Sequence, residues 1–86
     1  MRKDRRWYAK RLGLSEDQWN KVQKRLDKGP CESCGKAGPV VMDHNHKTGK
    51  FRGLLCHQCN VGIGFFKDEP KLLLAAINYL LAKEEH

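Results

Sequence analysis

Four cysteines stand in two short pairs whose spacing suits a metal ion. The pairs are Cys31-Glu32-Ser33-Cys34 and Cys56-His57-Gln58-Cys59, with residues 35–55 between them. Each pair offers two thiolates from one tight turn, and tetrahedral Zn²⁺ takes four sulfurs at about 2.3 Å. Two disulfides, reduced buried cysteines and a redox pair are the alternatives, but nothing marks secretion and a redox pair needs no second copy. The spacing therefore predicts a structural zinc site formed by Cys31, Cys34, Cys56 and Cys59.

A second group of polar residues lies between and just after the cysteine pairs. Asp43-His44-Asn45-His46 follows an apolar run, and Asn60 comes directly after Cys59. A carboxylate and an amide oxygen suit a hard cation such as Mg²⁺, and a neutral imidazole can take a proton from water near pH 7. These groups are the ones that metal-assisted hydrolysis uses. The alternative is a polar strand end and turn with exposed histidines, and the residue types alone favour neither.

The elements expected around these residues form a hairpin. Val40–Met42 predicts a short strand, residues 47–50 a turn, and Phe51–Leu55 the return strand. A regular strand would send Asp43 and His44 to opposite faces of the sheet. Both can serve one phosphate only if the strand ends or bulges there, as strands often do beside active sites.

Two helices are expected before the hairpin. Residues 2–12 are rich in Lys and Arg and are expected to be helical. Ser15 and Gln18 have the spacing of a capping box, which predicts a helix over about 16–27. Gly29-Pro30 then stops that helix.

Two further helices are expected after the hairpin. The first runs from about 56 to 66, although two glycines weaken it. Asp68 or Glu69 caps the last one, with Pro70 in its first turn. The last helix either packs on the core or forms a dimer contact, and the sequence leaves monomer or homodimer undecided. Its apolar face comprises Leu72, Leu73, Ala76, Ile77, Leu80 and Leu81.

Length and composition limit the fold to one small domain. The chain has 86 residues, of which 40% are hydrophobic and 31% charged, and no apolar run approaches the ~18 residues that span a bilayer. So small a core is marginal, and a structural zinc site supplies folding energy. We therefore expect a small zinc-stabilised α+β domain. It comprises a basic helical segment (1–29), a zinc-clamped ββα core (30–66) and a C-terminal helix (67–86).

Positive charge is concentrated at the start of the chain. Residues 1–30 hold ten Lys or Arg and four Asp or Glu, so they carry +6 of the net charge of +7. Such asymmetry favours a nucleic-acid partner, although a solvated basic surface can also serve solubility alone. Arg52 either meets a DNA phosphate or forms a surface salt bridge. The other predicted phosphate contacts are Arg2, Lys3, Arg5, Arg6, Lys10 and Arg11.

The combined motif resembles the recombination endonuclease VII family, a branch of the HNH, or His-Me finger, nucleases. The resemblance runs from about residue 12 to residue 82. It implies a ββα-metal core with flanking N- and C-terminal helices and a DNA-cleaving site. The matching residues are both cysteine pairs, Asp43-His44-Asn45-His46, Arg52–Cys56, Asn60, Gly62 and Gly64.

The resemblance also implies a role for each polar residue. Asp43 and Asn60 would bind a catalytic Mg²⁺ or Mn²⁺, and His44 would be the general base. His46 would bind or polarise the scissile phosphate, or protonate the leaving group. The alternatives are a zinc-ribbon-like nucleic-acid-binding module without catalysis and a protein that adjusts a partner's machinery. A pure binder has no need of all four residues.

Small proteins that resemble this chain occur in phages, some of them encoded beside DNA-packaging genes. The resemblance therefore implies DNA as a partner and makes a phage DNA-packaging or recombination protein a second candidate. No membrane partner is expected, because the sequence holds no apolar run long enough to span a bilayer. The expected location is the cytoplasm, which is the host's if a phage encodes the protein.

Overall fold

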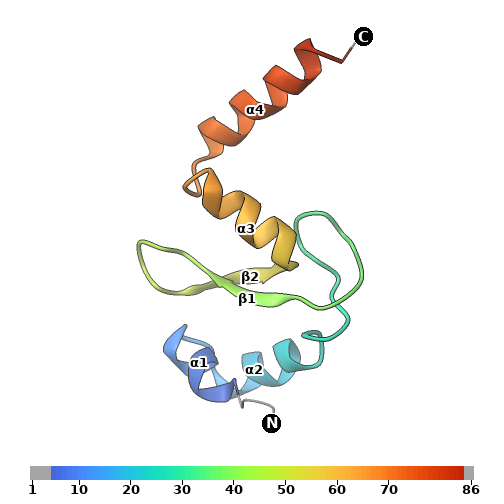
Figure 1. The fold of residues 1–86 in the computed structure, drawn as a ribbon. Coiled ribbons are helices and arrows are strands. Elements are labelled where there is room, and N and C mark those ends of the chain that lie inside the picture. Colours follow the sequence, from blue (N-terminus) through green and yellow to red (C-terminus); the bar gives the residue numbers. More distant parts are fainter. Residues whose placement is uncertain (1–4, 85–86) are drawn as a thin grey trace.

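A two-stranded antiparallel hairpin lies between two layers of helices (Figure 1). Helices α1 and α2 lie against one side of the hairpin, α3 stands on the other, and α4 continues away from the body. None of the helices in the described residues is long and apolar enough to cross a membrane. The computed structural model describes residues 5–84. Its elements are α1 (Arg6–Arg11), α2 (Glu16–Gln23), β1 (Val41–His44), β2 (Phe51–Leu55), α3 (His57–Phe65) and α4 (Pro70–Ala82).

One hydrophobic core joins the first two helices to the hairpin. Trp19 of α2 is buried, and Leu54 of β2 is fully buried. The backbone reinforces this contact, because the Phe51 N–H donates to the Leu12 carbonyl at 2.8 Å. The basic first segment is therefore also part of the packing. The buried hydrophobic residues are Ala9, Leu12, Leu14, Trp19, Val22, Leu26, Cys31, Val40, Met42, Leu54 and Leu55.

The capping box at the start of α2 is confirmed, but the helix ends earlier than expected. Ser15 Oγ accepts from the Gln18 N–H at 3.2 Å, and Gln18 Oε1 accepts from the Ser15 N–H at 2.8 Å. Beyond Gln23 the chain continues to residue 28 in turns. Its hydrogen bonds there include Arg25 to Val22, spaced i to i−3, which tightens the last turn. The first helix is likewise shorter than the expected 2–12, of which residues 2–4 lie outside the described part.

The hairpin carries a bulge where Asp43 and His44 meet. Asp43 pairs with Gly53 and His44 pairs with Phe51, so Arg52 is an extra residue on β2. The strand therefore bulges at this point, which is the condition that the sequence set for Asp43 and His44 to serve one phosphate. The first strand was expected at 40–42, and it instead runs to His44 because pairing continues across the bulge. Asn45 then begins the loop, in which its Oδ1 accepts from two backbone N–H groups.

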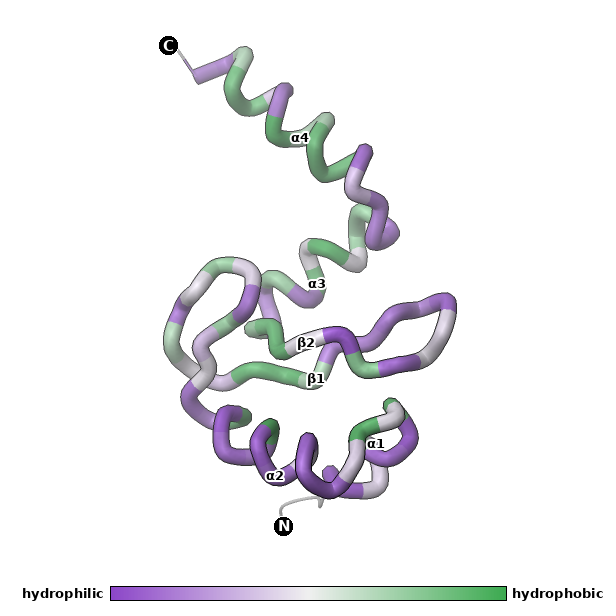
Figure 2. Tube along the Cα trace, turned by 180° about the vertical axis from the view of Figure 1, so that it is seen from behind, coloured by the Kyte–Doolittle hydropathy of each residue, from purple (hydrophilic) through white to green (hydrophobic). Residues whose placement is uncertain are grey.

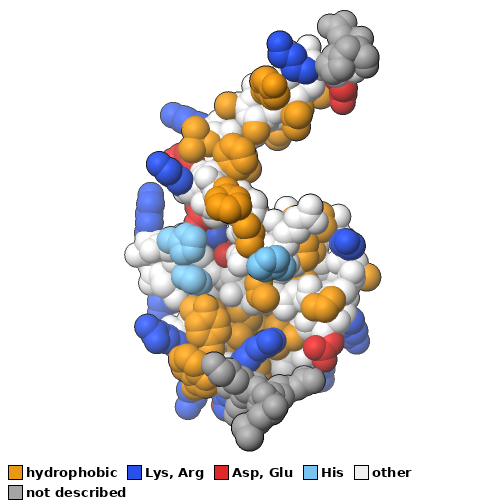
Figure 3. All heavy atoms as spheres, viewed as in Figure 1, with side chains coloured by type: hydrophobic (Ala, Val, Ile, Leu, Met, Phe, Trp, Pro, Cys, Tyr) orange, Lys and Arg blue, Asp and Glu red, His pale blue; other side chains and the backbone are white. Residues whose placement is uncertain are grey.

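The turn between α3 and α4 is tight, and α4 is exposed beyond it. Helix α3 covers most of the expected 56–66 range, and Pro70 is in the first turn of α4 as expected. Glu69 is the N-cap, but its side chain makes no capping hydrogen bond. The expectation that the apolar face of α4 packs on this chain's own core is wrong. Ile77 and Leu80 are 50% and 63% exposed, and Figures 2 and 3 show hydrophobic residues along α4.

Candidate metal centre and active site

The two cysteine pairs meet at the junction of the hairpin and α3. The four sulfur atoms all lie within 4.8 Å of one another, and Cys34 Sγ is 3.9 Å from Cys56 Sγ. Four sulfurs at about 2.3 Å around a tetrahedral ion lie about 3.8 Å apart, so the cluster has the size that zinc requires. The sequence prediction that Cys31, Cys34, Cys56 and Cys59 come together is confirmed.

Backbone N–H groups support the sulfurs from within each pair. Ser33 N and Cys34 N point at Cys31 Sγ at 3.3 and 3.5 Å, and Cys59 N points at Cys56 Sγ at 3.5 Å. Cys56 is also the N-cap of α3, so one sulfur serves both the cluster and the start of the helix. Thiolate charge is favourable at a helix N-terminus. The cysteine cluster thus determines where α3 begins.

The thiols of the cluster differ in how readily they ionise. The backbone N–H of Cys34 contributes most to lowering the pKa of Cys31 to about 6. The adjacent Cys56 side chain contributes most to raising the pKa of Cys59 to about 12. Neighbouring thiolates repel one another, so the four cannot all ionise unless a cation lies between them. This donor set fits a metal ion that keeps every sulfur deprotonated.

The first cysteine turn is attached directly to β2. The Glu32 N–H donates to the Leu54 carbonyl at 2.8 Å, and Glu32 Oε2 accepts from the Leu54 N–H at 3.0 Å. A Cβ atom at Gly53 would lie only 2.8 Å from Glu32 Oε1. Glycine is therefore needed next to the bulge for the Glu32 carboxylate to reach its partner.

Asp43 is a buried carboxylate that is paired with Arg52. The Asp43 side chain is 8% exposed, and Arg52 Nε donates to its Oδ2 at 2.6 Å. This hydrogen bond contributes most to raising the pKa of Arg52 above its usual value. Of the two alternatives for Arg52, the structure shows a salt bridge, and its contact with a DNA phosphate stays a prediction. An entering divalent ion would share Asp43 with this guanidinium.

The two histidines of the motif lie against each other. The ring centroids of His44 and His46 are 4.8 Å apart, with the ring planes at 81°. His44 borders a hollow of about 520 Å³ between α1 and the hairpin loop, which Arg11 and Lys50 also line. Phosphate groups would find positive charge beside the His44 imidazole in this hollow.

Asn60 lies in the first turn of α3, one residue after a cysteine of the cluster. Its backbone N–H donates to the Cys56 carbonyl at 2.9 Å. Within residues 5–84 no hydrogen bond of its side chain is seen, so the amide oxygen is available as a ligand. Carboxylate and amide oxygens such as those of Asp43 and Asn60 suit Mg²⁺ or Mn²⁺. No hydrogen bond joins these two side chains in the described part of the chain.

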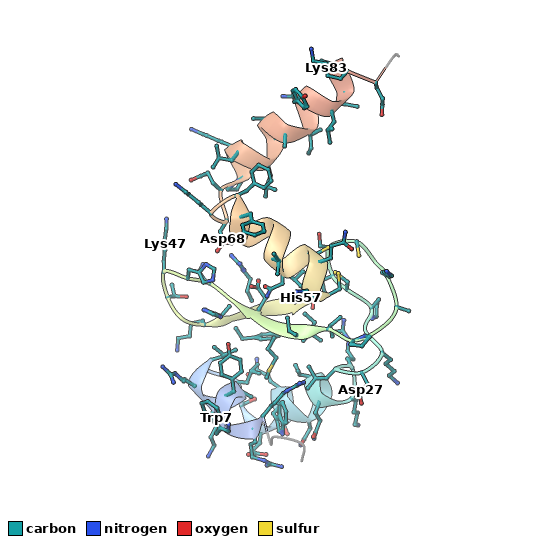
Figure 4. The ribbon with its side chains drawn as sticks, viewed as in Figure 1. Trp7, Asp27, Lys47, His57, Asp68 and Lys83 are labelled. Atoms are coloured by element: carbon teal, nitrogen blue, oxygen red, sulfur yellow. The ribbon has the colours of Figure 1, made fainter. Side chains whose placement is uncertain are left out.

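Asp68 lies against two of the predicted site residues, and sequence reasoning missed it. Its Oδ2 lies 2.6 Å from His46 Nδ1 and 3.4 Å from Arg52 Nη2, but neither contact has the alignment of a hydrogen bond. The sequence suggested only a capping role, because Asp68 stands just before the Pro70 helix. Its position in the turn after α3 brings it beside the hairpin loop that carries Lys47 (Figure 4). No local pattern in the sequence signals a partner so distant along the chain.

The basic residues of α1 lie mainly at the surface. Arg6 Nη1 forms an ion pair with Glu16 Oε1 at 2.9 Å. Lys10 and Arg11 are exposed in the last turn of α1, where positive charge suits the helix dipole. Arg2 and Lys3 lie outside the described residues. Phosphate binding by Arg2, Lys3, Arg5, Arg6, Lys10 and Arg11 stays a prediction.

The comparisons with known proteins agree with this architecture. The sequence profile of the recombination endonuclease VII family matches residues 3–82. The crystal structure of the ββα-Me type II restriction endonuclease Hpy99I superposes with a TM-score of 0.64 and 34% sequence identity. That match covers 92% of this chain and 47% of the other chain. The expected ββα-metal fold class, with flanking helices, is confirmed.

Two phage proteins are similar in sequence. The Gene 59 protein of Mycobacterium phage L5 is 36% identical over 74 residues, which are 80% of this chain and 44% of that protein. The Gene 59 protein of Mycobacterium phage D29 is 46% identical over 57 residues, which are 60% of this chain and 34% of that protein. The chain thus spans less than half the length of these relatives.

Proposed function

This chain belongs to the recombination endonuclease VII family, and we propose that it is a metal-dependent endonuclease of the HNH type. Its substrate is duplex DNA, in which it nicks or cuts by hydrolysing phosphodiester bonds. Zn²⁺ in the four-cysteine cluster is structural, because four thiolates leave no open coordination position. The likeness to a restriction endonuclease of the same fold supports this proposal.

We assign the proposed reaction to four side chains, which are one carboxylate, one amide and two imidazoles. Asp43 and Asn60 hold Mg²⁺ or Mn²⁺, which when bound polarises the scissile phosphate and stabilises the negative charge of the leaving oxygen. His44 takes the proton of the attacking water while the bond from phosphorus to the 3′ oxygen breaks. The 3′ oxygen leaves and takes up a proton, so the products are a 5′-phosphate and a 3′-hydroxyl. His46, two residues after His44, binds or polarises the scissile phosphate or protonates the leaving group.

One observation carries the proposal further than family membership alone. The bulge between Asp43 and His44 ends the regular alternation of β1 at these two residues. Asp43 is buried beside Arg52, whereas His44 borders the hollow lined by Arg11 and Lys50. Asp43 itself borders a different hollow, which Arg52 and Asp68 also line. The support for hydrolysis is that a carboxylate and a solvent-accessible imidazole are neighbours along the strand.

A plasmid-cleavage assay with and without Mg²⁺ tests the proposal. His44→Ala should lower the cleavage rate by ~10²–10⁴-fold while zinc content and DNA binding persist. His57→Ala is the matched control, because it removes an exposed imidazole between two cysteines of the cluster. Asp43→Ala and Asn60→Ala should be partly rescued by more Mg²⁺ or by Mn²⁺. Cleavage by His44→Ala at the wild-type rate would exclude the mechanism, and cleavage without any divalent ion would exclude the metal.

The proposal extends to the setting in which the protein works. Two similar proteins come from phages, which supports a phage origin and action in the cytoplasm of the host cell. A phage recombination or DNA-packaging protein is the proposed second partner, supported by the recombination endonuclease family match. The non-catalytic zinc-ribbon-like binder is the alternative, and it predicts DNA binding that no divalent ion converts into cleavage.

A further inference from the structure

Trp7 is an exposed aromatic residue on the basic helix α1. It is 58% exposed, whereas Trp19, the other tryptophan of the chain, is 5% exposed and belongs to the core. Exposure alone marks no site, because Phe65 at the end of α3 is 81% exposed. Two further features distinguish Trp7, which are the contact that its ring makes and the charged residues beside it.

The ring of Trp7 lies against the ring of Tyr8. Their centroids are 5.8 Å apart and the ring planes meet at 65°, which is an edge-to-face contact. Tyr8 is itself half-buried and packs against the hydrophobic core. This contact with an anchored ring restricts the indole, which lowers the side-chain entropy that a ligand stacking on it must remove.

Positive charge lies on the same side of α1 as the indole. Lys10 and Arg11 follow Trp7 by three and four residues, which makes them its neighbours on the helix surface, and both are exposed. Arg11 and Tyr8 also line the hollow of about 520 Å³ that His44 borders. On the face shown in Figure 3, hydrophobic side chains over α1 lie directly below two histidine side chains. An aromatic ring and two cations therefore lie next to the His44 hollow.

This combination suits a nucleic-acid strand whose bases are unpaired. In a regular duplex each base is stacked between its neighbours, so an aromatic side chain can stack on it only after the base has left the helix. An unpaired base offers a free face, and its phosphates stay charged. Proteins that bind single strands combine aromatic rings with positive charge along the backbone. Helix α1 has both, and none of its residues is acidic.

We propose that Trp7 is a stacking site for an unpaired DNA base, with the adjoining phosphates at Lys10 and Arg11. The choice of DNA as the ligand rests on the proposed nuclease function, but the stacking itself requires no cleavage. The site takes any of the bases, because each has an aromatic face. Since Arg11 belongs both to this site and to the lining of the His44 hollow, a strand held here leads to the candidate active site.

Tryptophan fluorescence tests the stacking site without any cleavage. The zinc-loaded protein is titrated with a single-stranded thymidine oligonucleotide in the absence of added Mg²⁺. Stacking should quench the emission of Trp7, whereas the buried Trp19 should not respond. Trp7→Phe, which leaves Trp19 as the emitting residue, should bind the oligonucleotide without quenching. Unchanged emission of the wild-type protein at saturation overturns the proposal.

Affinities measured with a labelled oligonucleotide provide the second readout. Trp7→Ala should bind the single strand about 5–150-fold more weakly and a blunt duplex of the same length as tightly as the wild type does. Trp7→Phe should recover part of the loss, and it decides the comparison if Trp7→Ala does not fold. Phe65→Ala is the matched control, because it removes an exposed ring from another helix. Equal losses in Trp7→Ala and Phe65→Ala, or on single strand and duplex, overturn the proposal.

The salt dependence of binding separates stacking from charge. Trp7→Ala should weaken single-strand binding by the same factor at every salt concentration, because a lost stacking contact changes no counterion release. A flattened slope in Trp7→Ala overturns the stacking role. A wild-type protein that cleaves no DNA overturns the proposed function, whereas the quenching result still decides the stacking site. Cleavage by a protein whose Trp7 shows no quenching overturns the stacking site alone.

Discussion

The Nε atom of Arg52 lies 2.6 Å from Oδ2 of Asp43, so the residue that the bulge adds to β2 neutralises the buried carboxylate of β1. This relationship has two consequences. The pair keeps a charged Asp43 in the interior of a very small fold. It also means that a divalent ion approaching Asp43 meets a positive charge that must move aside or share the carboxylate.

Arg52→Gln should destabilise the protein and make it more responsive to divalent ions. Asp43 would be left buried without its counter-charge, which should lower the free energy of unfolding by about 1–3 kcal/mol. The estimate lies at the lower end for a broken ion pair because the Arg52 side chain is 36% exposed. Mg²⁺ or Mn²⁺ can then replace the lost charge, so the rise in Tm on adding the ion should exceed that of the wild type.

Arg25→Gln is the matched control for this measurement. Its side chain has a similar exposure of 40%, but its carboxylate partner Glu32 is 4.0 Å away and is itself 48% exposed. We expect a loss below about 1 kcal/mol and a wild-type response to divalent ions. Equal Tm responses in Arg52→Gln and Arg25→Gln would show that the Arg52 guanidinium does not compete for the ion site.

Local patterns predicted the cysteine cluster, because each signal lies within a few residues of the feature it marks. Two cysteines three positions apart specify a turn, whereas the bulge entered only as the condition for Asp43 and His44 to serve one phosphate. The position of Asp68 follows instead from the turn after α3 and from His46, 22 residues earlier along the chain. The spacing of the apolar residues in α4 predicted a helix, but such spacing does not show what packs against the apolar face of that helix. The division into residues 1–29, 30–66 and 67–86 stays a prediction.

Removal of the cluster's metal should unfold the ββα unit. We expect one Zn²⁺ per chain. A strong chelator should abolish the contribution of α3 to the far-UV circular dichroism, since Cys56 caps that helix. Cys56→Ser should bind zinc weakly, whereas His57→Ala should retain it because four cysteines already complete the ligand set. A protein that keeps its structure after the metal has been stripped would contradict this.

Zinc affinity should rise with pH across the neutral range. The pKa of Cys59 is raised to about 12, so its thiol still holds a proton near pH 7 that the ion must displace. The pKa of Cys31 is lowered to about 6, and its thiolate is lost as the pH falls through that value. Protons therefore oppose binding more strongly at lower pH. Competition with a chromophoric chelator at pH values of about 6, 7 and 8 measures the slope, and a flat profile would rule out this ligand set.

Gly53→Ala should loosen the first cysteine turn from β2. The added methyl would displace the Glu32 carboxylate and break its hydrogen bond to the Leu54 N–H, at a cost of about 1–3 kcal/mol. Thermal unfolding of the zinc-loaded protein measures the loss. Gly35→Ala tests the specificity of the clash, because nothing lies near its Cβ position and its cost comes only from a φ of +78°. In a Glu32→Ala background, which already lacks this hydrogen bond, Gly53→Ala should cause no further loss, and fully additive losses would contradict the clash.

The basic surface of α1 should anchor DNA through its phosphates. Deleting the residues up to the end of α1 would change stability as well as DNA binding, because α1 also buries Ala9 and is followed by the core residue Leu12. Exchanging exposed side chains avoids that problem, so we consider the triple variant Arg5→Gln, Lys10→Gln and Arg11→Gln. Its zinc content should be unchanged, and its stability should fall by no more than about 1 kcal/mol from lost charge at the end of α1.

Binding measured at several salt concentrations decides the role of these three residues. Each lost phosphate contact should flatten the slope of log affinity against log salt by ~0.9, so the triple variant should lose up to ~2.7. All DNA sequences should be affected alike, since phosphate contacts read no bases. A control with the same change in charge replaces Lys36, Lys71 and Lys83, which are exposed elsewhere on the chain. If both triple variants flatten the slope equally, net charge and not the surface of α1 holds the DNA.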